Sequence, residues 1–163
     1  MRFETPTALA LEAAFDGGRL TSDGGLCWLA KADSKLDLCK TIADHVPEWR
    51  RREGRHSLVA LVRQRIFQIA CGYEDQNDSN TLRSDPLLQL VCGALPEPGG
   101  DLASQPTISR LENAATTRAC YEIAETLFGL YVRQRGKDGA PKKIVLDLDA
   151  TADPTHGEQE GSH

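Results

Sequence analysis

The sequence predicts a mainly α-helical domain over residues 1–140, followed over residues 141–163 by the first strand of an α/β domain. Two observations carry this prediction. Apolar residues recur at helical spacing in two long segments, 57–71 and 117–135, whereas residues 144–149 form a short aliphatic run with carboxylates at alternate positions. The composition, with 40% apolar and 26% charged residues among 163, is that of a globular domain and excludes a disordered or collagen-like chain.

The first half of the chain is predicted to be helical after a short N-terminal strand. Residues 8–15 alternate weakly in hydropathy and predict the strand. Residues 24–34 follow capping side chains and predict a first helix, and residues 35–46 predict a second that ends before a proline. The clearest helix covers residues 57–71, where the apolar stripe excludes three polar side chains: Arg63, Gln64 and Gln68.

The second half is predicted to contain a polar loop and three more helices. The loop covers residues 74–85, and Pro86 then opens a helix through the apolar run 87–95. Another helix starts at Gln105 with Ser104 as its N-cap. The last helix, 117–135, is expected to bury one apolar side: Cys120, Ile123, Ala124, Leu127, Phe128 and Tyr131.

Hydropathy and cysteine usage predict a cytoplasmic protein without a membrane partner. No stretch approaches the ~20 apolar residues of a membrane span, and the N-terminus lacks the apolar centre of a signal peptide. Five scattered cysteines form no C-x-x-C pair, so we expect reduced thiols, mostly in the core: Cys27, Cys39, Cys71, Cys92 and Cys120.

Positive charge is concentrated in two short segments, residues 47–65 and 131–143, of a chain whose net charge is −5. Residues 47–65 hold six arginines against two glutamates, and Arg50, Arg51, Arg52 and Arg55 lie beside Trp49. Guanidinium groups next to an aromatic ring suit contacts with phosphates and stacking on bases. A solvated helix end is the competing interpretation.

A second candidate DNA contact is the helix that begins after Ser104. Its first turns present short polar side chains and one arginine: Gln105, Thr107, Ser109 and Arg110. A recognition helix meets bases and phosphates with its N-terminal residues, and the helix dipole attracts phosphate there. The alternative is an ordinary capped helix whose Ile108 and Leu111 enter the core.

The C-terminal strand carries the candidate metal ligands. Asp147 and Asp149 fall on one face of the strand, and Asp153 and His156 follow. Carboxylate oxygens are the ligands that Mg²⁺ or Mn²⁺ prefers. A solvated strand face is the competing interpretation. Because a lone strand cannot pair its backbone, we expect that a larger α/β domain continues after residue 163.

Four blocks of sequence, taken in this order, resemble the N-terminal part of DDE-superfamily transposases of the family named after insertion sequence 1380. The blocks are residues 20–25, residues 72–78 with 82–86, residues 102–113, and residues 146–151 with 153–157. The resemblance implies a cut-and-paste transposase. Its helical region would engage the terminal inverted repeats of the element's DNA, and an RNase H-like domain would hold three catalytic acids.

In this superfamily the first acid commonly stands as Asp-x-Thr at the end of the first strand, which matches Asp149-Ala150-Thr151. The resemblance therefore implies that Asp149 is catalytic and ligates Mg²⁺ or Mn²⁺, with Asp147 and Asp153 as alternates. The second and third acids of the family lie beyond residue 163, so we expect residues 141–163 to begin a truncated RNase H-like domain. The chain is then expected to be a fragment that is inactive alone.

The expected partners are DNA at the element's ends, the full-length transposase or a second copy of the chain, which would place the protein on the nucleoid. Two alternatives stay open. One is a small helical DNA-binding or inhibitory module without catalysis. The other is a remnant that folds poorly, because an unpaired apolar strand favours aggregation.

Overall fold

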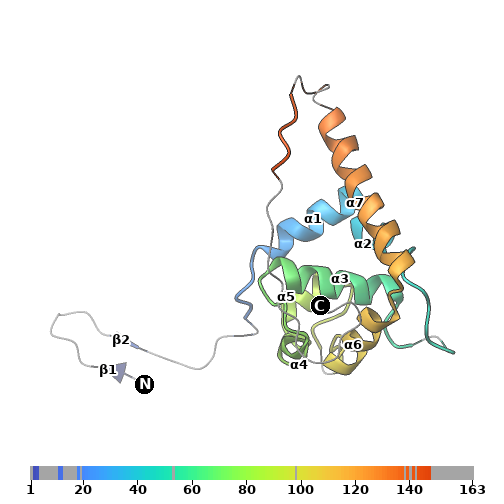
Figure 1. Ribbon diagram of the computed structural model, residues 1–163. Coiled ribbons are helices and arrows are strands. Elements are labelled where there is room, and N and C mark those ends of the chain that lie inside the picture. Colours follow the sequence, from blue (N-terminus) through green and yellow to red (C-terminus); the bar gives the residue numbers. More distant parts are fainter. Residues whose placement is uncertain are drawn as a thin grey trace.

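The computed structural model describes residues 2–3, 11–12, 18, 20–52, 54–97, 99–137, 139, 141 and 143–147. Within these residues the protein is mostly helical (Figure 1). The helices are α1 (Leu26–Leu36), α2 (Leu38–Ala43), α3 (Leu58–Ala70), the 3-10 helix η1 (Gln76–Asp78), α4 (Ser79–Leu82), α5 (Pro86–Val91), α6 (Gln105–Ala114) and α7 (Thr117–Gly136). Two short strands, β1 (Arg2–Phe3) and β2 (Leu11–Glu12), pair antiparallel, and β2 lies within the strand predicted over residues 8–15.

Helix α3 is the centre of the helical domain. It packs against α2 on one side and α6 on the other (Figure 1). The Ser57 side chain accepts a hydrogen bond from the backbone N–H of Ala60 and caps the helix, which ends before Gly72, where φ is +89°. These signals are local, and the helix predicted over residues 57–71 is confirmed to within one residue at each end.

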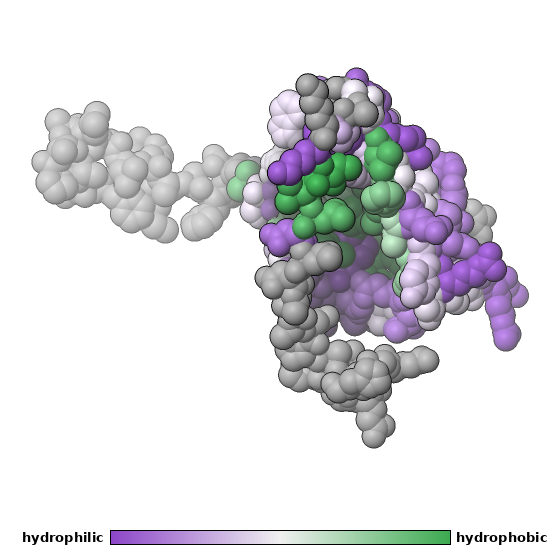
Figure 2. Space-filling view, turned by 45° about the horizontal axis from the view of Figure 1, so that its top comes forward, coloured by the Kyte–Doolittle hydropathy of each residue, from purple (hydrophilic) through white to green (hydrophobic). Residues whose placement is uncertain are grey.

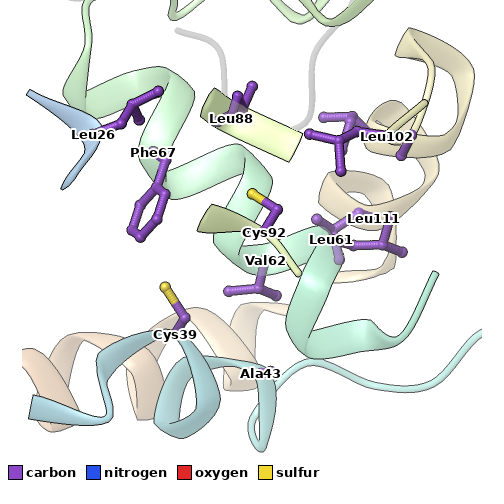
Figure 3. Close-up of a cluster of buried hydrophobic side chains, with 12 residues drawn as sticks. Leu26, Cys39, Ala43, Leu61, Val62, Phe67, Leu88, Cys92, Leu102 and Leu111 are labelled. Atoms are coloured by element: carbon purple, nitrogen blue, oxygen red, sulfur yellow. The ribbon is translucent and has the colours of Figure 1, made fainter. Parts of the chain in front are cut away.

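The core is built around α3 by buried apolar side chains from five helices and the segment before α6 (Figure 3). Leu61 and Ile108 are completely buried. The full set is Leu26, Cys39, Ala43, Leu61, Val62, Phe67, Leu88, Cys92, Leu102, Ala103, Ile108 and Leu111. Burial of each such leucine or isoleucine side chain contributes roughly 1.5–3 kcal/mol to folding.

The prediction that Gln64 and Gln68 lie outside the buried face of α3 is wrong. Each is 1% exposed. The Gln64 side chain donates to the carbonyl of Ala103 at 2.9 Å and accepts from the N–H of Ala103 at 3.0 Å. The Gln68 side chain accepts from the Ser79 hydroxyl at 3.1 Å. Partners elsewhere in the chain satisfy both polar atoms of the Gln64 amide but only the oxygen of the Gln68 amide, whose Nε2 is buried without a hydrogen bond among the described residues. Periodicity alone cannot reveal such partners.

Helices α1 and α2 correspond to the helices predicted over residues 24–34 and 35–46, with α1 shifted by two residues and α2 shorter at both ends. They are separated at Asp37, whose φ of +54° lies in the left-handed region and breaks the helix. Asp33 accepts a hydrogen bond from the backbone N–H of Cys39 at 2.8 Å, which fixes the start of α2 against the end of α1.

The segment predicted as a loop, residues 74–85, contains η1 and α4. The Asp75 side chain accepts from the N–H of Asn77 and starts η1, and the buried Ser79 ties α4 to α3. Asp85 then accepts from the backbone N–H groups of Leu87 and Leu88 and caps α5, with Pro86 in its first turn. Helix α5 ends before the predicted limit of residue 95, because Gly93 has a φ of +83°.

Helix α7 covers the predicted range 117–135, but the expected burial of its apolar side is wrong. Only Ala119 is buried, whereas Cys120 and Ala124 are exposed. Leu127, Phe128 and Tyr131 are also exposed, and Ile123 is half-buried. Figure 1 shows why, since much of α7 extends past the body of the domain.

The strand predicted over residues 144–149 is not seen in its described part. Residues 143–147 have no regular secondary structure, and Ile144, Val145 and Leu146 are each more than 70% exposed. The described residues place no strand beside them, so their backbone lacks the partner that a strand requires. Residues 148–149 lie outside the described residues. In the part of the chain described here, no helix is long and apolar enough to cross a membrane.

Candidate nucleic-acid interface

The loop between α2 and α3, residues 47–57, carries the first predicted set of DNA contacts, and we call it the basic loop. Arg50 organises it. Its guanidinium donates to both carboxylate oxygens of Glu48, at 2.7 and 2.6 Å, and to the carbonyl of His56 at 2.6 Å. Hydrogen bonds from Arg50 lower the pKa of Glu48 to about 2, so this carboxylate stays ionised at neutral pH. Arg50 therefore holds the two ends of the loop together.

The other arginines of the basic loop differ in how much of their charge is engaged. Arg55 donates to the carbonyl of Gly99 and links the loop to the chain before α6. Arg51 and Arg52 are exposed, and among the described residues neither has a salt-bridge partner. They are the guanidinium groups of this loop best placed to meet a phosphate.

Helix α6 presents the second predicted set. Ser104 is its N-cap residue, but its side chain makes no capping hydrogen bond, contrary to the expectation. Instead, the Asn80 side chain accepts from the N–H of Gln105 at 3.1 Å. Ile108 and Leu111 enter the core, as the ordinary-helix interpretation holds, and the opposite side leaves Arg110 exposed.

The fold brings two residues of each set together around one open hollow of about 410 Å³, which we call the basic hollow. Four of the predicted DNA contacts line it: Arg50 and Arg55 of the basic loop, and Thr107 and Arg110 of α6. Segments about fifty residues apart in the sequence thus share one surface. It is also lined by Trp49, Gly54, His56, Leu61, Arg83, Leu102 and Ser104.

The remaining predicted contacts lie outside the basic hollow. Arg51 and Arg52 line a neighbouring hollow of about 360 Å³, which Arg50 also borders. Gln105 and Ser109 are half-buried and line neither hollow. The Ser109 hydroxyl accepts from the Asn113 side chain at 3.3 Å. The predicted residues therefore divide between two adjacent surfaces that meet at Arg50.

Two residues of the basic hollow escaped the sequence analysis. Arg83 donates to the Asp101 carboxylate at 2.7 Å, and nothing in its surroundings in the sequence marks it as part of a basic site. Burial lowers the pKa of His56, and the positive charges of Arg55, Arg50 and Arg83 lower it further. His56 is therefore predominantly neutral at pH 7, and the positive charge of the hollow comes from arginines.

The predicted metal ligands fall at the edge of what the structure describes. Asp147 is exposed and in no regular element. Asp149, Asp153 and His156 lie outside the described residues. Within the described residues, no group of three or more His, Cys, Asp or Glu side chains could hold a metal ion.

The class of protein follows from comparison with known families. The chain matches the family model described as "Transposase DDE domain group 1" over residues 3–163, which is nearly its whole length. The protein therefore belongs to this family of DDE transposases. No curated protein matches it, and no solved structure matches it.

Proposed function

We propose that the helical domain binds DNA at the ends of a transposable element, as the end-recognising part of a transposase. The observation that carries the proposal is the basic hollow, where Arg50 and Arg55 meet Thr107 and Arg110 across about fifty residues of sequence. Exposed guanidinium groups, those of Arg110 in this hollow and of Arg51 and Arg52 beside it, attract phosphate, and the partly polar helix α6 provides groups that can read bases.

The residues divide into three roles. Arg51 and Arg52 contact the DNA backbone, because their charges are exposed and unpaired among the described residues. Arg50 and Arg55 shape the surface through their bonds to His56 and Gly99. The exposed Arg110 reads bases, with Gln105, Thr107 and Ser109 on the same helix assisting.

The proposal for catalysis rests on the resemblance to the insertion sequence 1380 family. Asp149 would be the first of three acids and would ligate Mg²⁺ or Mn²⁺, with Asp147 and Asp153 as alternates. Carboxylate oxygens suit these hard cations, and the metal would activate a hydroxyl group for attack on a phosphodiester bond.

The test is fluorescence anisotropy with the 163-residue chain and labelled duplexes from the DNA on either side of its gene, where this proposal places the terminal inverted repeats. A scrambled duplex serves as the reference. The R51A/R52A variant should weaken binding about tenfold on both duplexes and reduce the slope of log Kd against log salt by about 2, because two phosphate contacts are lost. The R110A variant should reduce the preference for the repeat over the scrambled duplex.

The matched control is K35A, which removes an exposed charge at the end of α1, away from both hollows. It should bind like the parent chain. Equal losses in K35A and R51A/R52A would overturn the proposed surface. Binding without preference for the repeats would favour the alternative of a small helical DNA-binding module.

A further inference from the structure

Gln68 on α3 is a polar residue that lies inside the domain. Hydrophilic side chains occupy much of the face shown in Figure 2, whereas Gln68 is only 1% exposed. Its Oε1 accepts from the Ser79 hydroxyl at 3.1 Å, but its Nε2 is buried and makes no hydrogen bond among the described residues. A buried N–H group without an acceptor is unfavourable, so we expect a partner for Nε2.

A small cavity adjoins this side chain, and we call it the Gln68 cavity. Its volume is about 10 Å³. A cavity needs roughly 10–15 Å³ to hold a water molecule, so this one has room for one at most. Ser79, the partner of Oε1, does not line the cavity, so Nε2 is the end of the amide that can face it. The cavity is lined by Asp23, Leu26, Phe67, Gln68, Cys71, Tyr73, Leu82, Asp85 and Leu88.

Two carboxylates supply hydrogen-bond acceptors on the other walls. Oδ2 of Asp23 accepts from the Tyr73 hydroxyl at 3.1 Å. Oδ1 of Asp85 accepts from the backbone N–H groups of Leu87 and Leu88, at 3.0 and 2.8 Å. Each carboxylate therefore keeps one oxygen, Oδ1 of Asp23 and Oδ2 of Asp85, that accepts no hydrogen bond from a described residue.

Cys71 indicates that both carboxylates lie close to the cavity. Burial raises the pKa of the Cys71 thiol, and the negative charges of Asp23 and Asp85 raise it further. Cys71 lines the same cavity. The Gln68 cavity thus combines one buried N–H donor with two carboxylate acceptors.

This set of groups selects the chemistry of the ligand. The ligand must accept a hydrogen bond from Nε2 of Gln68 and donate to carboxylate oxygens. Water does both, and a buried water typically makes about three hydrogen bonds. A metal cation suits carboxylates, but it cannot accept a hydrogen bond and would leave Nε2 without a partner. An anion would be repelled by the two negative charges.

We propose that the Gln68 cavity binds one internal water molecule, which accepts from Nε2 of Gln68 and donates to the carboxylates of Asp23 and Asp85. The water links the C-terminal half of α3 to the segment before α1 and to the beginning of α5. The inference does not depend on DNA binding by the basic hollow.

The site gives a common role to three of the sequence segments that carry the resemblance to transposases. Each segment supplies one lining residue, and these are Asp23, Tyr73 and Asp85. None of the three lines the basic hollow or its neighbour. Their role is therefore to hold the helical domain together around a hydrated polar site.

The first test is NMR spectroscopy of the ¹⁵N-labelled full chain. The side-chain NH₂ group of Gln68 should give NOE and ROE cross-peaks to water with opposite signs, as a water bound for longer than the tumbling time of the protein does. S79A should keep these cross-peaks, which excludes relay through the Ser79 hydroxyl. The exposed side chain of Gln134 on α7 is the internal control and should lack the long-lived signature. The same lack at Gln68 would overturn the proposal.

A second measurement counts long-lived waters by ¹⁷O relaxation dispersion. Q68M removes the buried donor and should lose one long-lived water relative to the parent chain, whereas Q134M should lose none. Circular dichroism checks that both variants are folded. A folded Q68M that retains the water count of the parent contradicts the proposal. If Q68M does not fold, the cross-peaks of the parent chain decide.

Manganese distinguishes a water from a cation at this site. MnCl₂ added to the labelled chain should broaden the side-chain signal of Gln68 no more than that of Gln64, whose amide is bonded to Ala103 instead. Preferential broadening at Gln68 would show that the two carboxylates bind a divalent cation, and the water would then be the wrong ligand.

Discussion

The carboxylate of Asp33 in α1 accepts a hydrogen bond from the guanidinium of Arg63 in α3 at 2.9 Å. Its other oxygen accepts from the backbone N–H of Cys39 at 2.8 Å. Burial alone would raise the pKa of Asp33, but the bonds from Cys39 and Arg63 outweigh it, and the pKa lies below its usual value. One buried charge thus connects three successive helices.

Removing that charge should destabilise the fold. In D33A, Arg63 and the N–H of Cys39 lose their acceptor, and we expect the free energy of unfolding to fall by about 2–4 kcal/mol. Urea denaturation followed by circular dichroism measures the loss. D44A is the control, because Asp44 pairs with Lys40 on the exposed surface and should change stability by less than about 0.5 kcal/mol. Similar losses in both variants would contradict the special role of Asp33.

The Gln64 side chain forms hydrogen bonds with both the carbonyl and the N–H group of Ala103. Q64M keeps the volume but leaves those two groups unpaired, and we expect a loss of about 2–4 kcal/mol in unfolding free energy. Q134M on the exposed surface of α7 should have little effect on the stability of the chain. If Q64M unfolds at the same urea concentration as the parent, the two bonds contribute nothing net.

The sequence predicts correctly those helix starts that depend on residues close to them in the sequence. Ser57, Asp85 and Pro86 begin helices through bonds within three residues, so α3 and α5 start where predicted. Gln64 and Ser79 are buried because of partners elsewhere in the chain, and no local pattern reports that.

The candidate interface likewise has a part that the sequence predicts and a part that only the packing of the helices creates. The sequence marks the arginines of the basic loop and of α6 as separate patches. Only the packing of α6 against α3 brings Arg50 and Arg110 to one hollow and adds Arg83 and His56. The apolar residues of α7 follow helical spacing, but the predicted burial of that side is wrong, because periodicity alone does not show whether the body of the domain covers a stripe.

The cysteines provide a test of the packing. Burial raises the pKa of Cys92 to about 12, and burial together with Asp33 raises that of Cys39 to about 12, so neither forms a thiolate at neutral pH. Cys27 and Cys120 are exposed. We expect Ellman's reagent to modify these two rapidly in the native chain, as mass spectrometry of the labelled peptides would show.

Cys71 is intermediate in exposure and should react more slowly, whereas Cys39 and Cys92 should react only on unfolding. C27S/C120S is the matched control and should lose the rapid phase. Rapid labelling of Cys39 in the folded chain would show that α2 does not pack on α3 as described.

His56 makes DNA binding depend on pH in a direction that its surroundings determine. Its pKa is lowered from the ordinary 6.5, first by burial and then by Arg55, Arg50 and Arg83. As pH falls, the folded chain therefore gains this positive charge at a lower pH than the unfolded chain does. Two effects follow as pH falls: stability decreases, and the positive charge of the basic hollow increases.

We expect DNA affinity at fixed salt to rise between pH 7.5 and pH 5.5 by about two- to fivefold more in the parent chain than in H56Q, because one further cation faces the phosphates. Anisotropy titrations of both proteins at each pH provide the comparison, which cancels the titration of other groups. H56Q should also lose less stability than the parent over the same interval, since it has no proton to take up on unfolding. Parallel pH profiles for the two proteins would mean that His56 does not face bound DNA, and the DNA would then contact Arg51 and Arg52 without entering the basic hollow.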